Sequence, residues 1–326
     1  MLTIAISKTR LSQVQSGAII IAGQPAQFAV AGPGAVECVQ GITTNDVVKP
    51  GPGSLVYGAI LTPKGMIIAD CWVLRPPGDG ELILVADRSV ESELADLFKR
   101  QFPPRIAKVT NRTAAGRCRW VVGGQALALL SSRMGHPIEP GQASAWRIGD
   151  ETVHVAAPSN DRAPFGVLVV GSATGCEAAA ADLAAGGAAF GTEDDLVAAR
   201  VLSGFPSLGA EIDERTMPAE VDYGGIGGVS HSKGCYVGQE TVARLHFRGH
   251  PNWLLRRVRW LTGINPPASG ELVEAGKVVA RIGSVLQLED GSTLGLAKVR
   301  REIEAGTTVG GATIESLPDN QRAPKR

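Results

Sequence analysis

The sequence predicts an α+β fold in which two similar units with antiparallel sheets precede a small β domain. Two successive stretches share the order of a strand, a helix, further strands and a helix, which indicates a duplicated module. Short turns rich in glycine and proline join their strands, as expected for antiparallel hairpins. After Asn252 the helical period disappears and alternating strands remain. A chain of 326 residues is long enough for two or three domains.

These changes of pattern set the expected domain boundaries. The first α+β unit spans residues 1–115 and the second spans 116–250, and the chain is allowed to cross between them. A C-terminal β barrel spans 251–318. The polar residues 319–326 are expected to form a flexible tail.

In the first unit, strands and helices alternate with clear breaks. Gly32-Pro33-Gly34 ends the first strand, and Thr62-Pro63-Lys64-Gly65 has the residue types of a turn between two strands. Apolar residues at i, i+4, i+7 and i+8 from Val90 to Phe98 predict an amphipathic helix. The other predicted elements are the strands Gln27–Ala31, Ser54–Leu61, Met66–Leu74 and Glu81–Ala86 and the helix Ala35–Gln40.

The second unit repeats this order, and the C-terminal part has strands only. Thr192 followed by three acids predicts the start of a further helix, because negative charge is favourable at a helix N-terminus. Gly149-Asp150 predicts a hairpin turn. The predicted strands are Arg119–Val122, Ala145–Ile148, Thr152–Ala156, Gly166–Gly171, Trp253–Leu261, Val278–Leu288 and Ser292–Val299, and the helices are Gln125–Ser131, Glu177–Leu183 and Glu193–Leu202.

Composition excludes several classes of protein. Lys+Arg and Asp+Glu number 32 each, so no overall charge favours nucleic acid or an anionic membrane. Five scattered cysteines without a CxxC pair are typical of free thiols in a reducing cytoplasm. No signal peptide and no apolar run of about 20 residues is found, so a cytoplasmic location is expected. Phosphate-loop, dinucleotide-binding, nucleophile-elbow and HExxH motifs are missing from the sequence.

The segment Lys233-Gly234-Cys235-Tyr236-Val237-Gly238-Gln239-Glu240 has the strongest functional character. Its cysteine lies between glycines, which allow close approach of a ligand to the backbone. A lysine two residues earlier favours the thiolate, the form that attacks electrophiles and binds metals. The segment has no helical or strand period, so we expect a loop. The alternative is a buried structural cysteine in a glycine-rich turn.

Two further patterns surround this segment. His231, Cys235, His246 and His250 have the residue types of a zinc or iron site, but arginines among them oppose a cation, so a single thiolate from Cys235 is favoured over a four-ligand site. A local excess of positive charge suits an anionic tail or an acidic partner, or else a solvated strand face. Its members are Lys233, Arg244, Arg248, Arg256, Arg257 and Arg259.

Asp70 is an acid within the otherwise apolar strand that begins at Met66. It either points inward, hydrogen-bonded at a central cavity, or lies on the solvent face. Since charged residues are mostly exposed, the solvent face is favoured.

Together these residues resemble the YgfZ family, folate-binding-type proteins of iron–sulfur cluster assembly. The octapeptide is similar to the family's signature. Supporting segments are Gln40–Val47, Tyr57–Asp70 and Lys298–Glu302. The wider family includes the glycine-cleavage aminomethyltransferase (T-protein). The resemblance implies a three-domain cloverleaf around a channel for tetrahydrofolate, made of two ferredoxin-like antiparallel α/β units plus a C-terminal β barrel.

The resemblance also implies roles for individual residues. Cys235 is expected to be the thiolate that acts on, or shares, a transient iron–sulfur cluster, and Lys233 is expected to lower its pKa. An A-type iron–sulfur carrier or client iron–sulfur proteins are the implied partners, with no nucleic acid and no membrane. The expected contacts to folate or to the docked partner are Asn45, Asp46, Asp70, Tyr236, Gly238, Gln239, Glu240, Arg244 and Arg248.

Two positions depart from the aminomethyltransferase pattern. That pattern has two consecutive acids where this chain has Ala69-Asp70, and its pterin-binding carboxylate falls at Leu202. A leucine accepts no hydrogen bond from a pterin edge. These departures argue against aminomethyl transfer. The alternatives kept open are a folate-dependent one-carbon transferase or demethylase, in which Cys235 is structural, and a non-catalytic scaffold.

Overall fold

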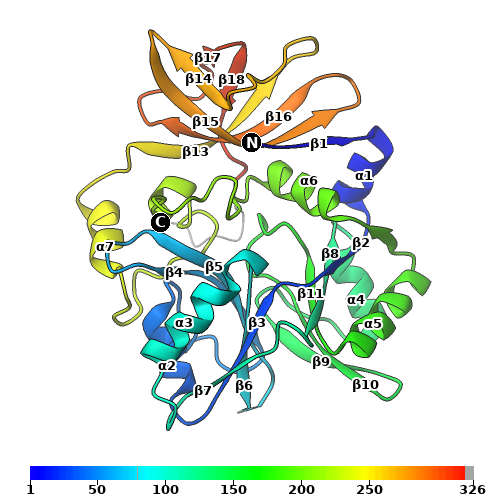
Figure 1. Ribbon diagram of the computed structural model, residues 1–326. Helices are drawn as coiled ribbons and strands as arrows, with labels where there is room; N and C mark the ends of the chain where they lie inside the picture. Colours follow the sequence, from blue (N-terminus) through cyan, green and yellow to red (C-terminus); the bar gives the residue numbers. More distant parts are fainter. Residues whose placement is uncertain (79, 320–326) are drawn as a thin grey trace.

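The computed structural model describes residues 1–78 and 80–319, and these form three β-sheets with helices packed around them (Figure 1). The predicted tail therefore lies, apart from Asp319, outside the described residues. In the described part of the chain, no helix has the length and apolar character needed to cross a bilayer.

The first sheet is antiparallel, with the strand order β4-β5-β6-β3-β7. Helices α2 and α3 cover one of its faces through a core that includes Phe28, Val39 and Phe98. Acids in the first turn of α3 and cations in its last turn match the helix dipole. Its elements are β3 (Ala26–Ala31), α2 (Ala35–Ile42), β4 (Ser54–Leu61), β5 (Ile67–Arg75), β6 (Glu81–Ala86), α3 (Glu91–Gln101) and β7 (Lys108–Asn111).

The second sheet has the order β12-β2-β8-β11-β10-β9. Helices α4 and α5 pack on it through a separate apolar cluster that includes Leu130 and Leu183. Its elements are β2 (Ile19–Gly23), β8 (Arg117–Val122), α4 (Ala126–Met134), β9 (Ala143–Ile148), β10 (Glu151–Ala156), β11 (Val167–Gly171), α5 (Ala173–Ala185), β12 (Ala189–Gly191) and α6 (Glu193–Ser203).

The C-terminal sheet follows the path β1-β15-β16-β13-β18-β17, with β14 paired to β15. Among the described residues no pairing joins the two ends of this path, so the predicted closed barrel is not confirmed. Its elements are β1 (Leu2–Ile6), β13 (Trp253–Trp260), β14 (Glu271–Glu274), β15 (Lys277–Leu288), β16 (Thr293–Arg300), β17 (Thr308–Val309) and β18 (Ala312–Glu315).

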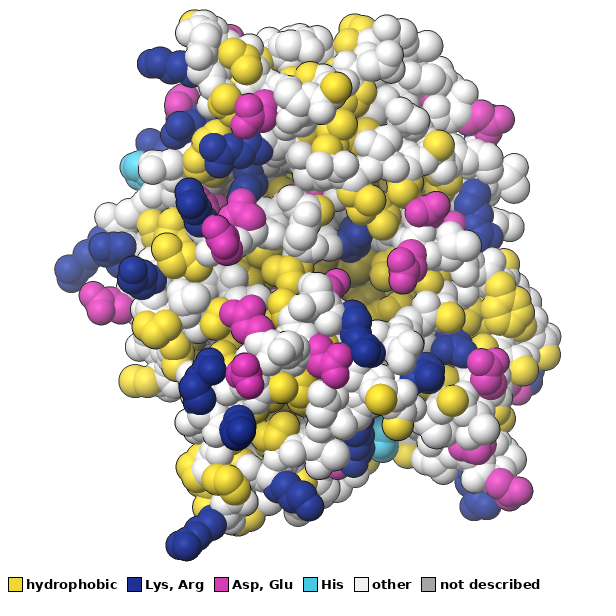
Figure 2. Space-filling model, viewed as in Figure 1, with side chains coloured by type: hydrophobic (Ala, Val, Ile, Leu, Met, Phe, Trp, Pro, Cys, Tyr) yellow, Lys and Arg dark blue, Asp and Glu magenta, His cyan; other side chains and the backbone are white. Residues whose placement is uncertain are grey.

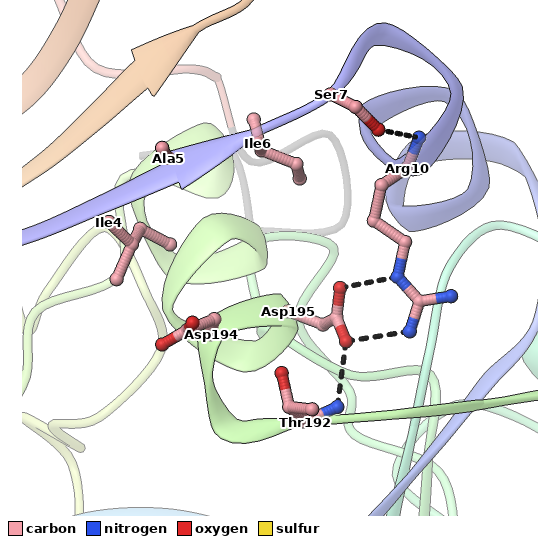
Figure 3. A pocket seen from close by; sticks show the side chains of 8 residues that line it. All are labelled: Ile4, Ala5, Ile6, Ser7, Arg10, Thr192, Asp194 and Asp195. Atoms are coloured by element: carbon pink, nitrogen blue, oxygen red, sulfur yellow. Dashed lines mark hydrogen bonds and ion pairs between the residues drawn. The ribbon is translucent and has the colours of Figure 1, made fainter.

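The N-terminal residues connect the sheets. Strand β1 pairs in parallel with β15 of the C-terminal sheet, and β2 pairs with β8 and β12 of the second sheet. Between them lies α1 (Lys8–Ser16), whose Arg10 forms two hydrogen bonds of 2.6 and 2.7 Å with Asp195 of α6 beside a cavity of about 280 Å³ (Figure 3). The domain boundaries at 115 and 250 stay a prediction. Strands β1 and β2 lie within the predicted first unit, but they pair with strands of the C-terminal sheet and the second sheet.

Most predicted strands and helices match the structure within a few residues, but the helix α7 (Gln239–Phe247) was missed. The last two residues of the octapeptide, Gln239 and Glu240, therefore start a helix and do not continue the loop. The strands β1, β2, β7, β12, β14, β17 and β18 and the helix α1 were also missed, because short segments give too few repeats to show a period.

A central core forms where the sheets meet. It joins Ile4 of β1, Leu74 of β5, Val122 of β8 and Val201 of α6 with Leu286 of β15. Burial of apolar side chains from every sheet therefore holds the units around one centre.

Candidate ligand cavity and the Cys235 loop

A cavity of about 540 Å³ opens at this centre. It lies between the first two sheets and α6, and the space-filling view shows a hollow with apolar walls in the middle of the molecule (Figure 2). This volume is in the ordinary range for small-molecule sites. The side chains that matter most below are Asp70, Trp72, Arg88, Trp120, Phe165, Leu196, Arg200 and Phe205.

Aromatic side chains form much of the wall. Phe165 contacts both Trp72 and Trp120, with ring centroids 4.8 Å apart in each pair. The rings of Trp72 and Phe205 are parallel within 14° at 6.2 Å. Flat apolar surfaces of this kind favour a planar heterocycle as ligand. No sequence period singled out these aromatics, because they come from different elements.

Asp70 faces this cavity from β5, so the favoured solvent-face prediction was wrong. Tyr57 donates a hydrogen bond of 2.9 Å to its carboxylate, and the hydroxyls of Tyr57 and Tyr223 are 3.1 Å apart. Burial raises the pKa of Asp70 above its usual value, while the bond from Tyr57 lowers it. Asp70 is thus a held carboxylate at the edge of an apolar site, the setting in which acids take functional roles.

Ala69 lies on the opposite face of β5. It is fully buried in the core between the first sheet and its helices. Successive residues of a strand point to opposite faces, so an acid at position 69 would not face the cavity. The acid that does so is Asp70, and the departure at Ala69 therefore gives no argument against chemistry in this cavity.

Arg200 was missed by the sequence analysis. It lines the cavity from α6 together with Leu196 and Val197, at the i, i+1 and i+4 positions of one helix face. Its helical spacing from the apolar Leu196 and Val197 was the available signal. Leu202 lines a different cavity, on another side of α6.

Asn45 and Asp46 have structural contacts and do not line the cavity in the described part of the chain. The Asn45 amide donates to the carbonyls of Tyr57 and Gly227 at 2.8 and 2.7 Å. Asp46 accepts from the N–H groups of Val48 and Lys49, both at 3.0 Å. Burial works to raise the pKa of Asp46, but these bonds keep it below its usual value.

The Lys233 ammonium is held by three carbonyl oxygens. Its Nζ donates to Gln40 and Thr43 at 2.6 Å and to Asn45 at 2.9 Å. Burial lowers the pKa of Lys233 to about 8, and the charge of Asp46 opposes this. Three acceptors require three N–H donors, which only the charged form has. Lys233 therefore ties the loop to the end of α2, while its predicted effect on the thiol stays a prediction.

Cys235 is exposed, so the structural alternative of a buried cysteine is wrong. Tyr236 lies beneath the Lys233 ammonium at 4.9 Å, and its N–H donates to the Gln239 side chain at 3.1 Å. Gly238 has φ +83° before α7, and an added Cβ there would lie 2.6 Å from the Thr62 carbonyl oxygen. The loop is therefore ordered by its neighbours and presents its thiol to solvent.

The remaining predicted residues are spread over the surface. Glu240, Arg244 and Arg248 are exposed on α7 or just after it. Arg257 and Arg259 of β13 pair with Glu315 instead, so the predicted positive patch is divided. Among the described residues, the cavity lining contains no residue of the octapeptide or of α7.

The histidine and cysteine pattern does not assemble as four ligands. The rings of His231 and His246 stack with centroids 3.6 Å apart. Among the residues that the structure describes, no group of three His, Cys, Asp or Glu side chains is placed to hold a metal ion. A single-thiolate role for Cys235 does not need such a group.

Known proteins match both the sequence and the fold. Residues 11–151 match the GCVT N-terminal domain. The tRNA-modifying protein YgfZ of Cronobacter sakazakii is 28% identical over 85% of this chain and 83% of that protein. Its counterpart in Yersinia pestis is 32% identical over 41% of this chain and 44% of that protein. The glycine cleavage system aminomethyltransferase T from Bartonella henselae superposes with a TM-score of 0.72 at 17% identity, covering 95% of this chain and 88% of that one. The chain is therefore similar in sequence to YgfZ proteins over most of its length, matches the GCVT N-terminal domain over residues 11–151, and has the fold of the glycine-cleavage aminomethyltransferase.

Proposed function

We propose that this chain is a cytoplasmic factor for the assembly or repair of iron–sulfur clusters, that it binds a tetrahydrofolate species in the central cavity, and that Cys235 supplies its thiolate. The observation that carries the folate part is the cavity itself, with aromatic walls, a held carboxylate at Asp70 and a cation at Arg200. The similarity to YgfZ proteins agrees with the family resemblance from which this assignment was expected.

The cavity suits a reduced folate in chemical terms. The aromatic walls would hold the planar ring by stacking, and Asp70 would accept hydrogen bonds from ring N–H groups. Arg200 brings a cation to the cavity wall, where it would pair with an acceptor of the ligand. Bound tetrahydrofolate would supply a carrier for one-carbon groups. One-carbon transfer or demethylation is thus the alternative function, and a non-catalytic folate-binding scaffold is another.

The exposed thiol suits contact with another protein. Cys235 lies in the loop just before α7, and Phe247, with 69% of its surface accessible, is the last residue of that helix. An A-type carrier or a client iron–sulfur protein would reach a thiol here without entering the cavity. The cluster in this scheme is cargo that Cys235 ligates during transfer, as thiolates do for iron–sulfur clusters.

The test uses two variants in a strain without the native gene. Cys235→Ser is expected to lose the activity of a cellular iron–sulfur enzyme while keeping folate binding, and Cys38→Ser, a partly buried cysteine elsewhere, should behave as the wild type. Full restoration of the enzyme by Cys235→Ser would show that the thiol is not needed.

A second candidate is direct action on tRNA, favoured by the name of the YgfZ relatives, which are described as tRNA-modifying proteins. The zero net charge and the pairing of Arg257 and Arg259 with Glu315 favour an indirect contribution. Titration of fluorescent tRNA should then show only weak binding that salt removes. Tight binding that persists at 200 mM salt, on the order used to separate specific from non-specific complexes, would support direct action.

A further inference from the structure

Arginines gather around Trp253 at one end of the C-terminal sheet. Trp253 of β13 pairs directly with Arg300 of β16, so both side chains lie on one face of the sheet. The guanidinium carbons of Arg281 and Arg300 lie 4.9 and 4.3 Å from the centre of the Trp253 ring. Among the described residues, Arg300 and Arg301 form no ion pair within 4.0 Å, and Arg281 reaches only Glu271, at 3.8 Å. The chain itself therefore leaves most of this positive charge without a partner.

This group of arginines continues into α7 and the Cys235 loop. The N–H of Arg301 donates to the carbonyl of Asn252 at 2.9 Å, and Asn252 is five residues after the end of α7. The ring of His231 stacks on that of His246 at 3.6 Å, so the start of the loop lies against the last turn of α7. Dark blue side chains gather along the left edge of Figure 2, where Figure 1 places β13 and α7. The arginines and the exposed thiol of Cys235 thus belong to one side of the molecule.

Charge and aromatic content indicate what this side of the molecule binds. The sequence has no acid between Glu240 and Glu271, a stretch that includes most of α7 and all of β13. Phe247 is exposed at the end of α7, and exposed aromatics with arginines are typical anchors of protein–protein interfaces. Glu240, Glu271 and Glu302 border the basic stretches and would repel a phosphate backbone that extends past them. An acidic protein surface therefore fits better than a nucleic acid.

We propose that this Arg–Trp surface docks an acidic face of the protein that meets Cys235, an inference that rests on the proposed function for the role of the thiol. The members of the surface are Arg244, Phe247, Arg248, Trp253, Arg300 and Arg301. Helix α7 has nine residues and extends about 14 Å at 1.5 Å per residue, which is less than the diameter of a small domain. One partner domain can therefore contact the arginines and reach the thiol together.

Two synthetic peptides test this docking. Each has one cysteine joined by a disulfide to thionitrobenzoate, and one is rich in glutamate where the other has glutamine. The Cys235 thiolate attacks the peptide sulfur and releases thionitrobenzoate, which is followed by its absorbance. The wild type should react at least about fivefold faster with the glutamate peptide, because docking raises the peptide concentration near the thiol. Rates of Cys235→Ser are subtracted to remove reaction at other cysteines.

Paired substitutions locate the docking surface. The variant Arg300→Gln/Arg301→Gln should react with both peptides at the same rate. Arg100→Gln/Arg105→Gln is the matched control, because it removes two exposed arginines from the end of α3 and the loop after it, and it should keep the preference. Equal rates in the wild type, or a preference that survives in a folded Arg300→Gln/Arg301→Gln protein, would overturn the inference.

Binding without reaction separates this inference from the proposed function. If Cys235 reacts with neither peptide, the proposed role of the thiol fails, and fluorescence anisotropy of the glutamate peptide without its disulfide then decides the docking. Binding that does not depend on Arg300 and Arg301, or no binding, would overturn the inference. Displacement of the bound peptide by a lower concentration of single-stranded RNA of equal length would assign the surface to nucleic acid and would overturn it as well.

Discussion

Replacing Lys233 with methionine distinguishes a lysine that orders the Cys235 loop from one that activates the thiol. In the structure, its three donors are used by the carbonyls of Gln40, Thr43 and Asn45. The Lys233→Met variant keeps most of the apolar stem and removes all three bonds. We therefore expect a loss of stability and little change in thiol reactivity.

The magnitude follows from these contacts. A hydrogen bond from a charged group contributes about 1.5–3 kcal/mol, and a buried acceptor left without a donor costs about 1–3 kcal/mol. The three carbonyl groups are only partly buried, so water can hydrogen-bond to them in the variant and reduce the loss of stability. Methionine also removes the free-energy cost of burying the lysine ammonium group. The expected decrease in the free energy of unfolding is about 2–4 kcal/mol.

Urea unfolding followed by circular dichroism measures this change. Cys235→Ser is the control, because an exposed side chain usually changes stability by no more than about 0.5 kcal/mol. Lys233→Arg should not restore full stability, since a planar guanidinium does not present three donors from one atom. The pH dependence of Cys235 alkylation, followed by mass spectrometry, gives the second readout. A Lys233→Met protein as stable as the wild type, with a higher alkylation pKa at Cys235, would refute the ordering role.

Three further predictions concern backbone, cavity and interdomain contacts. Gly238→Ala should destabilise by about 2–3 kcal/mol, because its φ is +83° and a Cβ would meet backbone, whereas Gly234→Ala, with open space around it, should be neutral in the same unfolding assay. Asp70→Asn should raise the melting temperature at pH 7 and weaken folate binding. Burial raises the pKa of Asp70, so its charge destabilises the fold above that pKa, and the gain should vanish below about pH 4. Arg10→Gln should destabilise at pH 7. Burial works to raise the pKa of Asp195, but the contacts with Arg10 keep it below its usual value. The wild type should therefore lose the stabilisation from this pair as the pH falls through that low pKa. If the free energy of unfolding of Arg10→Gln followed pH in parallel with that of the wild type, the prediction would be contradicted.

Regular elements were predictable where their residues repeat. The strands β4 and β6 were predicted with the bounds that the structure has, because each is a continuous apolar run between turns. The N-terminal strands were not, because β1 and β2 are five residues each and gain their stability from partners far along the chain. Such pairing has no local signal.

The candidate site was predictable only in part. A reactive thiol at Cys235 was expected from its glycine-rich setting, and the structure adds that the side chain is exposed. The inward position of Asp70 was not predicted. A β-bulge near Ile68 interrupts the alternation of inward and outward side chains along β5, and one acid in an apolar strand does not show which face of the sheet it lies on. Arg200 and the aromatic walls needed the fold itself, since elements far apart in sequence bring them together.

Binding of 5-formyltetrahydrofolate, measured by calorimetry, tests the central claim that the cavity holds a reduced folate. Leu196 lines the cavity on the same face of α6 as Arg200 and is only partly buried, so Leu196→Trp would fill space that the ligand needs. Leu196→Met conserves volume and is the control. The wild type and Leu196→Met should bind one equivalent, and Leu196→Trp should bind at least about tenfold more weakly. No binding by the wild type, or equal binding by a folded Leu196→Trp protein, would contradict the assignment of the cavity.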